Sequence, residues 1–147
     1  MKLAHRVHTP ASPAEVWAVL GDPARWPEFD LSLRQVRGAS GPAASGQHLL
    51  GLSRVSSLRV PVDVVEAVPE RRLVLLVHTA PGLREQVSYD LTPAVRGGCD
   101  ISTSVVVDGF LARAAVLPLW LARAFTARLL AARTQHSADR SGRSGAA

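Results

Sequence analysis

Residues 12–29 read SPAEVWAVLGDPARWPEF, and this stretch does most to define the fold. Ser12 suits the N-cap of a helix, Pro13 its first position and Glu15 its third, a combination typical of a capping box. The residues that follow at helical spacing form one apolar face, made of Val16, Trp17, Val19 and Leu20. The pattern predicts a short helix that stops at Gly21.

Proline also marks the ends of the predicted elements on either side of this helix. A second short helical turn is predicted from Pro23 to Trp26, and we expect Pro27 to end it. Upstream, residues 2–9 read KLAHRVHT, which is typical of a strand that ends where Pro10 removes a backbone donor.

Downstream, the period of the apolar residues changes from that of a helix to that of strands. Six segments alternate in this way, at 31–38, 46–54, 59–67, 71–78, 83–92 and 98–107. Each break between them carries Gly, Pro or Ser, the residues that favour turns. Consecutive strands with short links predict an antiparallel meander.

Alternation within the last two strands assigns their side chains to faces. Glu85, Val87 and Tyr89 share one side of their strand. Thr103 and Val105 share one side of the final strand, and the intervening polar residues are expected to face solvent.

A long helix is predicted from about 110 to 135, where apolar residues recur at helical spacing. Pro118 implies a kink or a break in this helix. The predicted domain spans residues 1–136, and the Ser-, Gly- and Arg-rich residues 137–147 are expected to be a disordered tail.

The composition excludes several functional classes. The net charge is +5, with 17 Lys and Arg against 12 Asp and Glu, but the cations are scattered and aromatic residues are only 5%. Nucleic-acid binders cluster cations or interleave them with aromatics, so no nucleic-acid partner is expected.

Further exclusions concern cysteine, metal and membrane. Cys99 is the single cysteine, which rules out an intrachain disulfide, and no His and carboxylate spacing suits a metal, so neither metal nor cofactor is expected. The N-terminus lacks a signal-peptide core, and the apolar region 110–133 is interrupted by Arg. A cytoplasmic protein without stable membrane insertion is the expectation.

Several motifs resemble those of one superfamily. Residues 12–17 and 22–29 (SPAEVW and DPARWPEF) are similar to the opening SPEEVWAVLSDPARWPEW of the birch-pollen-allergen-like, START-related superfamily, often labelled SRPBCC. Residues 69–73 (PERRL) resemble its turn before a strand, and residues 89–93 (YDLTP) with Gly97-Gly98 resemble its penultimate hairpin. The resemblance covers roughly residues 2–135.

This resemblance implies an α+β helix-grip fold. Such a fold has a curved antiparallel seven-stranded sheet wrapped around a long C-terminal helix, with two short helices after the first strand. Superfamily members include polyketide cyclases and dehydratases, coenzyme Q-binding proteins and lipid carriers, so the shared fold implies a cavity but no single chemistry. A strongly bent sheet cannot press its whole concave face against one helix, and here the inward residues are mostly small aliphatics, which also favours a cavity.

Within that cavity, two groups of side chains are candidates. Trp26 and Phe29 are expected to form a flat wall near its mouth, although ordinary core packing explains them equally well. Tyr89 and Glu85 share an inner face and could supply acid–base chemistry, with His48 as a third member if its strand turns that face inward. His48 alternates with Leu50 and Leu52. The sequence does not determine which face of this strand, or of the strand that carries His78, is the inner one. The other predicted ligand contacts are Leu50, Val87, Thr103, Val105, Leu117, Leu121, Phe125 and Arg128. Arg128 either anchors an acidic group of the ligand or extends its charged end into solvent.

Three functions remain open at this level. The first is binding of a small hydrophobic ligand, such as a lipid, a polyketide or an isoprenoid-like metabolite. The second is a polyketide aromatase or cyclase that uses Tyr89, Glu85 and His48. The third is a homodimer or membrane-surface module. On the predicted last helix, the side opposite the regularly spaced apolar residues carries further apolar side chains that could form a contact surface, namely Val116, Leu119, Trp120 and Leu130.

Overall fold

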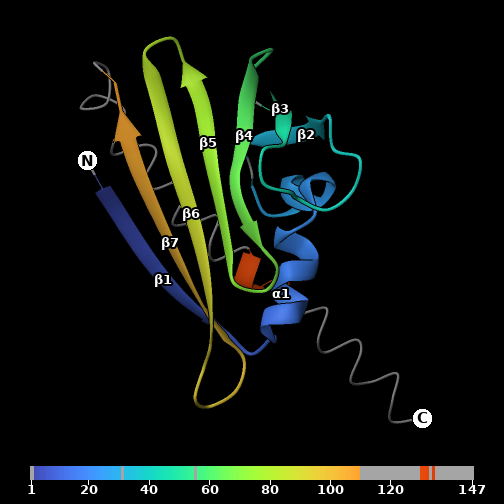
Figure 1. The fold of residues 1–147 in the computed structure, drawn as a ribbon, viewed down its shortest axis with the longest axis vertical. Coiled ribbons are helices and arrows are strands. Elements are labelled where there is room, and N and C mark those ends of the chain that lie inside the picture. The colour runs from blue at the N-terminus through green and yellow to red at the C-terminus, as the bar shows by residue number, and fades with distance from the viewer. Residues whose placement is uncertain (1, 31, 55, 110–129, 133, 135–147) are drawn as a thin grey trace.

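The computed structural model describes residues 2–30, 32–54, 56–109, 130–132 and 134. Seven strands form one antiparallel sheet in the order β1-β7-β6-β5-β4-β3-β2. They are β1 (Lys2–Thr9), β2 (Leu33–Arg37), β3 (His48–Ser53), β4 (Arg59–Val68), β5 (Arg72–Ala80), β6 (Leu83–Pro93) and β7 (Cys99–Asp108). The predicted meander is confirmed. It is joined at one edge by β1, which pairs with the last strand (Figure 1).

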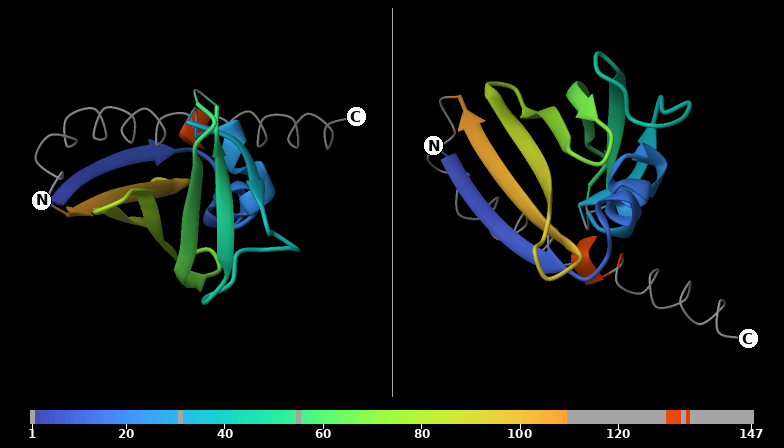
Figure 2. Two further views of the ribbon diagram at one scale, coloured as in Figure 1. Left: turned by 90° about the horizontal axis from the view of Figure 1, so that it is seen from above. Right: turned by 60° about the horizontal axis from the view of Figure 1, so that its bottom comes forward.

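The sheet is strongly bent, so that the half containing β1, β7 and β6 turns away from the half containing β4, β3 and β2 (Figure 2). The strand register shifts at three places: between Leu33 and Gln35 in β2, between Val64 and Glu66 in β4, and between Val77 and Ala80 in β5. Register irregularities of this kind increase local twist and bend a strand. Two of them lie in the half containing β4, β3 and β2, and the third lies in β5, next to that half.

The first helix, α1 (Pro13–Leu20), begins as its sequence predicts. Ser12 Oγ accepts a hydrogen bond from the Glu15 amide at 3.2 Å, and Glu15 Oε1 accepts one from the Ser12 amide at 3.3 Å. This confirms the capping box, which satisfies two amides that the first helical turn leaves unpaired. Val16, Val19 and Leu20 are buried against the sheet.

The second helix is longer than predicted. It is a 3-10 helix, η1 (Pro23–Glu28), and Pro27 lies inside it instead of ending it. The expectation at Pro27 was therefore wrong, because only six residues are involved and most of their amides lack a helical partner in any case. The η1 helix contacts β2 and α1, and thus brings its Trp26, and Phe29 directly after it, into the core over the sheet.

Only a short part of the predicted C-terminal helix lies among the described residues. Residues 130–132 and 134 are helical, and they are held to the end of β1. Thr9 Oγ1 donates to the Ala131 carbonyl and lies 3.3 Å from Thr134 Oγ1, which in turn donates to the Ala131 carbonyl at 2.9 Å. The tail predicted at 137–147 lies outside the described residues.

Leu130 corrects one expectation about this helix. Its side chain is fully buried in the hydrophobic core, whereas the sequence placed it on the outer side of the helix as part of a contact surface. Val116, Leu119 and Trp120, the rest of that surface, lie outside the described residues. In the part of the chain that the structure describes, no helix is long and apolar enough to cross a membrane.

Candidate functional site

A cavity of about 230 Å³ lies within the bend of the sheet. Its volume exceeds the roughly 150 Å³ of an engineered protein cavity that holds benzene, so the cavity has room for a small organic molecule. The described residues that line it are mainly apolar: Leu20, Trp26, Phe29, Asp30, Ser32, Leu33, Ser53, Leu58, Val60, Val62, Leu73, Leu75, Val77, Thr79, Glu85 and Tyr89.

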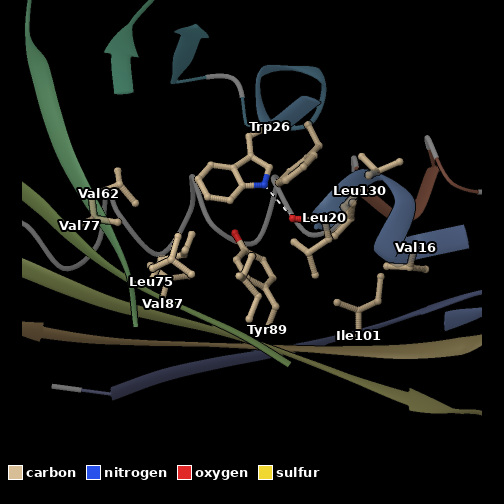
Figure 3. Packing of buried hydrophobic residues seen from close by; sticks show 14 of the residues in the cluster. Val16, Leu20, Trp26, Val62, Leu75, Val77, Val87, Tyr89, Ile101 and Leu130 are labelled. Carbon is tan, nitrogen blue, oxygen red and sulfur yellow. Dashed lines mark hydrogen bonds between the residues drawn. The ribbon is translucent and has the colours of Figure 1, made fainter. Parts of the chain in front are cut away.

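Two aromatic side chains, Trp26 and Tyr89, line this cavity. Trp26 of η1 is 3% exposed, and its Nε1 donates to the Leu20 carbonyl at 2.8 Å, which holds the indole ring in place. Tyr89 of β6 rises from the sheet so that its hydroxyl points toward the Trp26 ring (Figure 3). The pair supplies a flat apolar surface together with one phenolic hydroxyl.

The two carboxyl groups of the described lining come from different parts of the fold. Glu85 of β6 is 1% exposed, and Thr79 Oγ1 donates to its Oε1 at 2.6 Å. Asp30 follows η1, and its Oδ1 accepts hydrogen bonds from the Ser32 amide at 3.0 Å and the Ser32 hydroxyl at 2.6 Å. Both carboxyl groups are therefore held by local hydroxyl donors.

The cavity opens toward solvent on the side of β2 and β3. Ser32 is exposed, and Leu58, which precedes β4, has 61% of its surface accessible, although both residues line the cavity.

The structure brings several of the predicted site residues together. Trp26, Phe29, Tyr89 and Glu85 all line the cavity. Val87, Thr103 and Val105 lie on the same inner face, as predicted, but are buried in the core beside it and do not line it. Thr103 pairs with Tyr89 on one side and with His5 on the other. Within the described part of the chain, Thr103 Oγ1 and His5 Nε2 are buried without a hydrogen-bond partner.

The structure decides the inner face of β3, which the sequence left open, and it contradicts the predicted ligand contact of Leu50. Leu49 pairs with Val62 and Gly51 with Val60, and both valines line the cavity, so Leu49 and Gly51 face inward. His48 and Leu50 therefore point to the outer face, because neighbouring residues of a strand face opposite sides. Neither can contact a ligand in the cavity, and His48 is removed from the proposed catalytic set.

Four predicted ligand contacts lie outside the described residues: Leu117, Leu121, Phe125 and Arg128. The lining residues of β4, Val60 and Val62, were not predicted as ligand contacts, although they alternate with Pro61 and Asp63. Those of β5 were not predicted because its run 73–77 is apolar on both faces. Such strands show no alternation from which to choose an inner face.

On the outer face, one carboxylate joins three strands. Asp63 of β4 accepts a hydrogen bond from His48 Nδ1 of β3 at 2.6 Å and one from His78 Nε2 of β5 at 3.0 Å. The hydrogen bonds from His48 and then from His78 lower the pKa of Asp63 below its ordinary value of 3.8. Among the described residues, no group of three His, Cys, Asp or Glu side chains is arranged to hold a metal ion.

This pKa shift makes a prediction about acid stability. The unfolded chain protonates Asp63 near its ordinary pKa of 3.8, and the folded chain does so only at lower pH. Stability contributed by Asp63 is therefore present above about pH 4 and lost as the pH falls through the folded-state pKa. In urea unfolding from pH 7 to pH 2.5, the stability difference between the wild-type protein and Asp63→Asn should shrink at the acid end. A difference that stays constant over this range would contradict the prediction.

Comparison with solved structures defines the class of fold. The chain is similar to the hypothetical protein jhp0584 from Helicobacter pylori (13% identity, TM-score 0.75, covering 91% of this chain and 88% of that one). It is also similar to Ara h 8.0201 (13% identity, TM-score 0.62, 88% and 97%) and to DynU16, a putative protein of the dynemicin biosynthetic locus (19% identity, TM-score 0.70, 88% and 45%). These similarities show the birch-pollen-allergen-like fold.

The sequence identifies the family within that fold. The family model described as polyketide cyclase / dehydrase and lipid transport matches residues 1–140, and the chain belongs to this family. No curated protein sequence matches the chain.

Proposed function

We propose that this protein binds a small, mainly apolar molecule in the cavity between Trp26 and Tyr89. The single observation that carries the proposal is the cavity of about 230 Å³, whose described lining is mostly aliphatic and aromatic. Empty apolar space is costly in a protein core, since its lining atoms lose packing partners on one side. A ligand that fills the space would recover those contacts.

The description of the family, which includes both cyclases and lipid transport, supports ligand binding without deciding the ligand. The similar protein DynU16 belongs to the dynemicin biosynthetic locus, which agrees with a polyketide or another secondary metabolite as the ligand class. The apolar lining accommodates an isoprenoid-like or lipid tail as well.

A matched pair of variants on β5 tests the proposal. Leu75 lines the cavity and is 7% exposed, whereas the next residue, Leu76, points to the outer face and is half-buried. Leu75→Trp should fill the cavity and weaken binding of the uncharged dye N-phenyl-1-naphthylamine at least about tenfold, a loss of about 1.4 kcal/mol. Leu76→Trp adds the same bulk outside and should leave binding unchanged.

Dye fluorescence measures the affinity, and circular dichroism establishes that each variant is folded, because overpacking a core can itself destabilise a protein. If Leu75→Trp does not fold, Val62→Phe provides a smaller intrusion into the same space. Equal dye affinity in the folded inner-face and outer-face variants would show that the cavity is not the binding site.

An enzymatic role is the second candidate, because Tyr89 and Glu85 are both buried and line the same cavity. They lie four residues apart on β6, about 13 Å along the strand, so they would act on different parts of a long substrate. Burial raises the pKa of the Cys99 thiol, which makes that group a poor nucleophile at neutral pH. Conversion of a linear triketone to its cyclic, dehydrated product would establish an enzyme of the cyclase type.

A further inference from the structure

Three arginines lie at the mouth of the cavity. Three of the lining residues there are each followed in the chain by an arginine, and all three arginines are exposed. Adjacent residues of a chain have Cα atoms only about 3.8 Å apart, so each arginine lies at the rim of the opening. These pairs of residues are Leu33-Arg34, Ser53-Arg54 and Leu58-Arg59.

Hydrogen bonds between neighbouring strands bring these arginines together. Arg54 Nη2 donates to the Leu33 carbonyl at 3.2 Å, and the Ser53 amide donates to the Leu58 carbonyl at 3.0 Å. Each of these carbonyl groups belongs to the peptide bond that leads to the next arginine. The three arginines are therefore carried by β2, β3 and β4, which are adjacent in the sheet and together span roughly 10 Å.

This part of the chain is cationic. Residues 31–62 contain four Arg and no Lys, Asp or Glu, whereas residues 63–109 contain four Arg and seven Asp or Glu. Within the described ranges, none of the three arginines at the mouth forms an ion pair. Residues 110–129 contain no Asp or Glu, so they supply no carboxylate partner. Asp30 of the lining is buried and accepts hydrogen bonds from Ser32, which leaves the exposed surface around the mouth positive.

An exposed apolar side chain lies among these arginines. Leu58 lines the cavity at its mouth and is 61% exposed. Cations beside an exposed apolar group suit the surface of an anionic bilayer, because the cations meet lipid headgroups while the apolar group enters the boundary of the acyl chains. A nucleic acid would leave Leu58 in water, and Trp26 and Phe29 are too deeply buried to stack on its bases.

We propose that the mouth of the cavity docks on an anionic membrane surface. Arg34, Arg54 and Arg59 contact the lipid headgroups, and Leu58 enters the interface between headgroups and acyl chains. The cavity then opens toward the bilayer, so an apolar ligand passes between the two without crossing water. This inference goes beyond the proposed function, because the surface binds a membrane whether or not the cavity holds a ligand.

Sedimentation with lipid vesicles tests the proposal. The whole chain of 147 residues is mixed with phosphatidylcholine vesicles that contain either no phosphatidylglycerol or about one third of it, at roughly 0.1 M NaCl. The protein should bind the anionic vesicles at least about tenfold more tightly than the neutral ones. Salt at roughly 0.5 M should release it, because salt screens exposed charges.

A double variant, Arg34→Gln with Arg59→Gln, tests the role of the arginines. Binding to the anionic vesicles should weaken at least about tenfold, since each cation near a membrane surface contributes about fivefold. The matched control is Arg71→Gln with Arg96→Gln, which removes two exposed arginines from the turns at the opposite end of the sheet (Figure 1). It changes the net charge by the same amount and should keep wild-type binding within about threefold.

Leu58→Ser tests the apolar part of the contact. This variant should bind the anionic vesicles at least about threefold more weakly, because it no longer buries a leucine in the interface. Circular dichroism establishes that each variant is folded. If folded Leu58→Ser binds as the wild type does, the arginines form a general site for polyanions such as nucleic acids or acidic proteins, and docking on a membrane is overturned.

Two further results would overturn the inference: equal binding to neutral and anionic vesicles, and equal weakening in the two double variants. Binding of N-phenyl-1-naphthylamine to the wild-type protein tests the proposed function separately. If the dye binds and the vesicles do not, docking fails and the ligand-binding cavity stands. If the vesicles bind and the dye does not, the proposed function fails and the docking surface stands.

Discussion

Gly98→Ala is expected to destabilise the protein by about 3–4 kcal/mol, near the upper end for a single substitution. Gly98 lies in the turn between β6 and β7 with φ of +78°, a conformation that costs an L-residue roughly 1–2 kcal/mol. A Cβ atom at this position would also overlap the Thr9 carbonyl oxygen and would lie 2.8 Å from Pro10 Cα. Both are backbone atoms at the end of β1, so they cannot rotate away.

Gly97 provides the control within the same turn. Its φ is +91°, but nothing lies within 4 Å of a Cβ added there. Gly97→Ala should therefore carry only the conformational cost of about 1–2 kcal/mol. Urea unfolding of the two variants measures the difference. Equal midpoints would show that the close approach of this turn to the end of β1 does not contribute.

Leu73→Ala is expected to destabilise the protein by about 2–5 kcal/mol and to enlarge the ligand cavity. Leu73 is completely buried on the inner face of β5, directly opposite Tyr89 of β6, and it lines the cavity. Because Leu73 borders the cavity, fewer side chains surround it that could move into the volume that the truncation vacates. The cost should therefore lie in the upper part of the range.

Leu76→Ala removes the same atoms from the outer face of the same strand. Leu76 is only half-buried there, so its truncation should cost about 1 kcal/mol or less. Thermal and urea unfolding compare the two variants. A larger dye than N-phenyl-1-naphthylamine should also gain affinity for Leu73→Ala relative to the wild type. Equal loss of stability in both variants would mean that the inner face of β5 is not the packed side of the sheet.

The prediction from sequence succeeded where a local pattern determines a local structure. The capping box at Ser12 and Glu15 formed as expected, because both hydrogen bonds join residues three positions apart. In β6 and β7 the apolar and polar residues alternate clearly, and the predicted inner residues, including Tyr89 and Thr103, are buried.

The prediction failed where both faces of a strand are apolar. In β3, Leu49, Leu50 and Leu52 permit either face to be the inner one, so the face that carries His48 stayed open and the predicted ligand contact of Leu50 was wrong. The contact between Thr79 and Glu85 was likewise not predictable. It joins two strands beside a register shift, between Val77 and Ala80, that no local pattern specifies.

The amino-acid sequence alone determined the order of helices and strands and the family motifs at 12–29, because turn residues, caps and the spacing of apolar residues act over a few positions. Tertiary structure decided which faces of β3, β4 and β5 enclose the cavity. It also decided that His48 lies on the outer face and that Thr79 donates a hydrogen bond to Glu85. Pairing register between strands, together with the bends at their irregularities, sets these relations, and register depends on contacts between residues far apart in the chain.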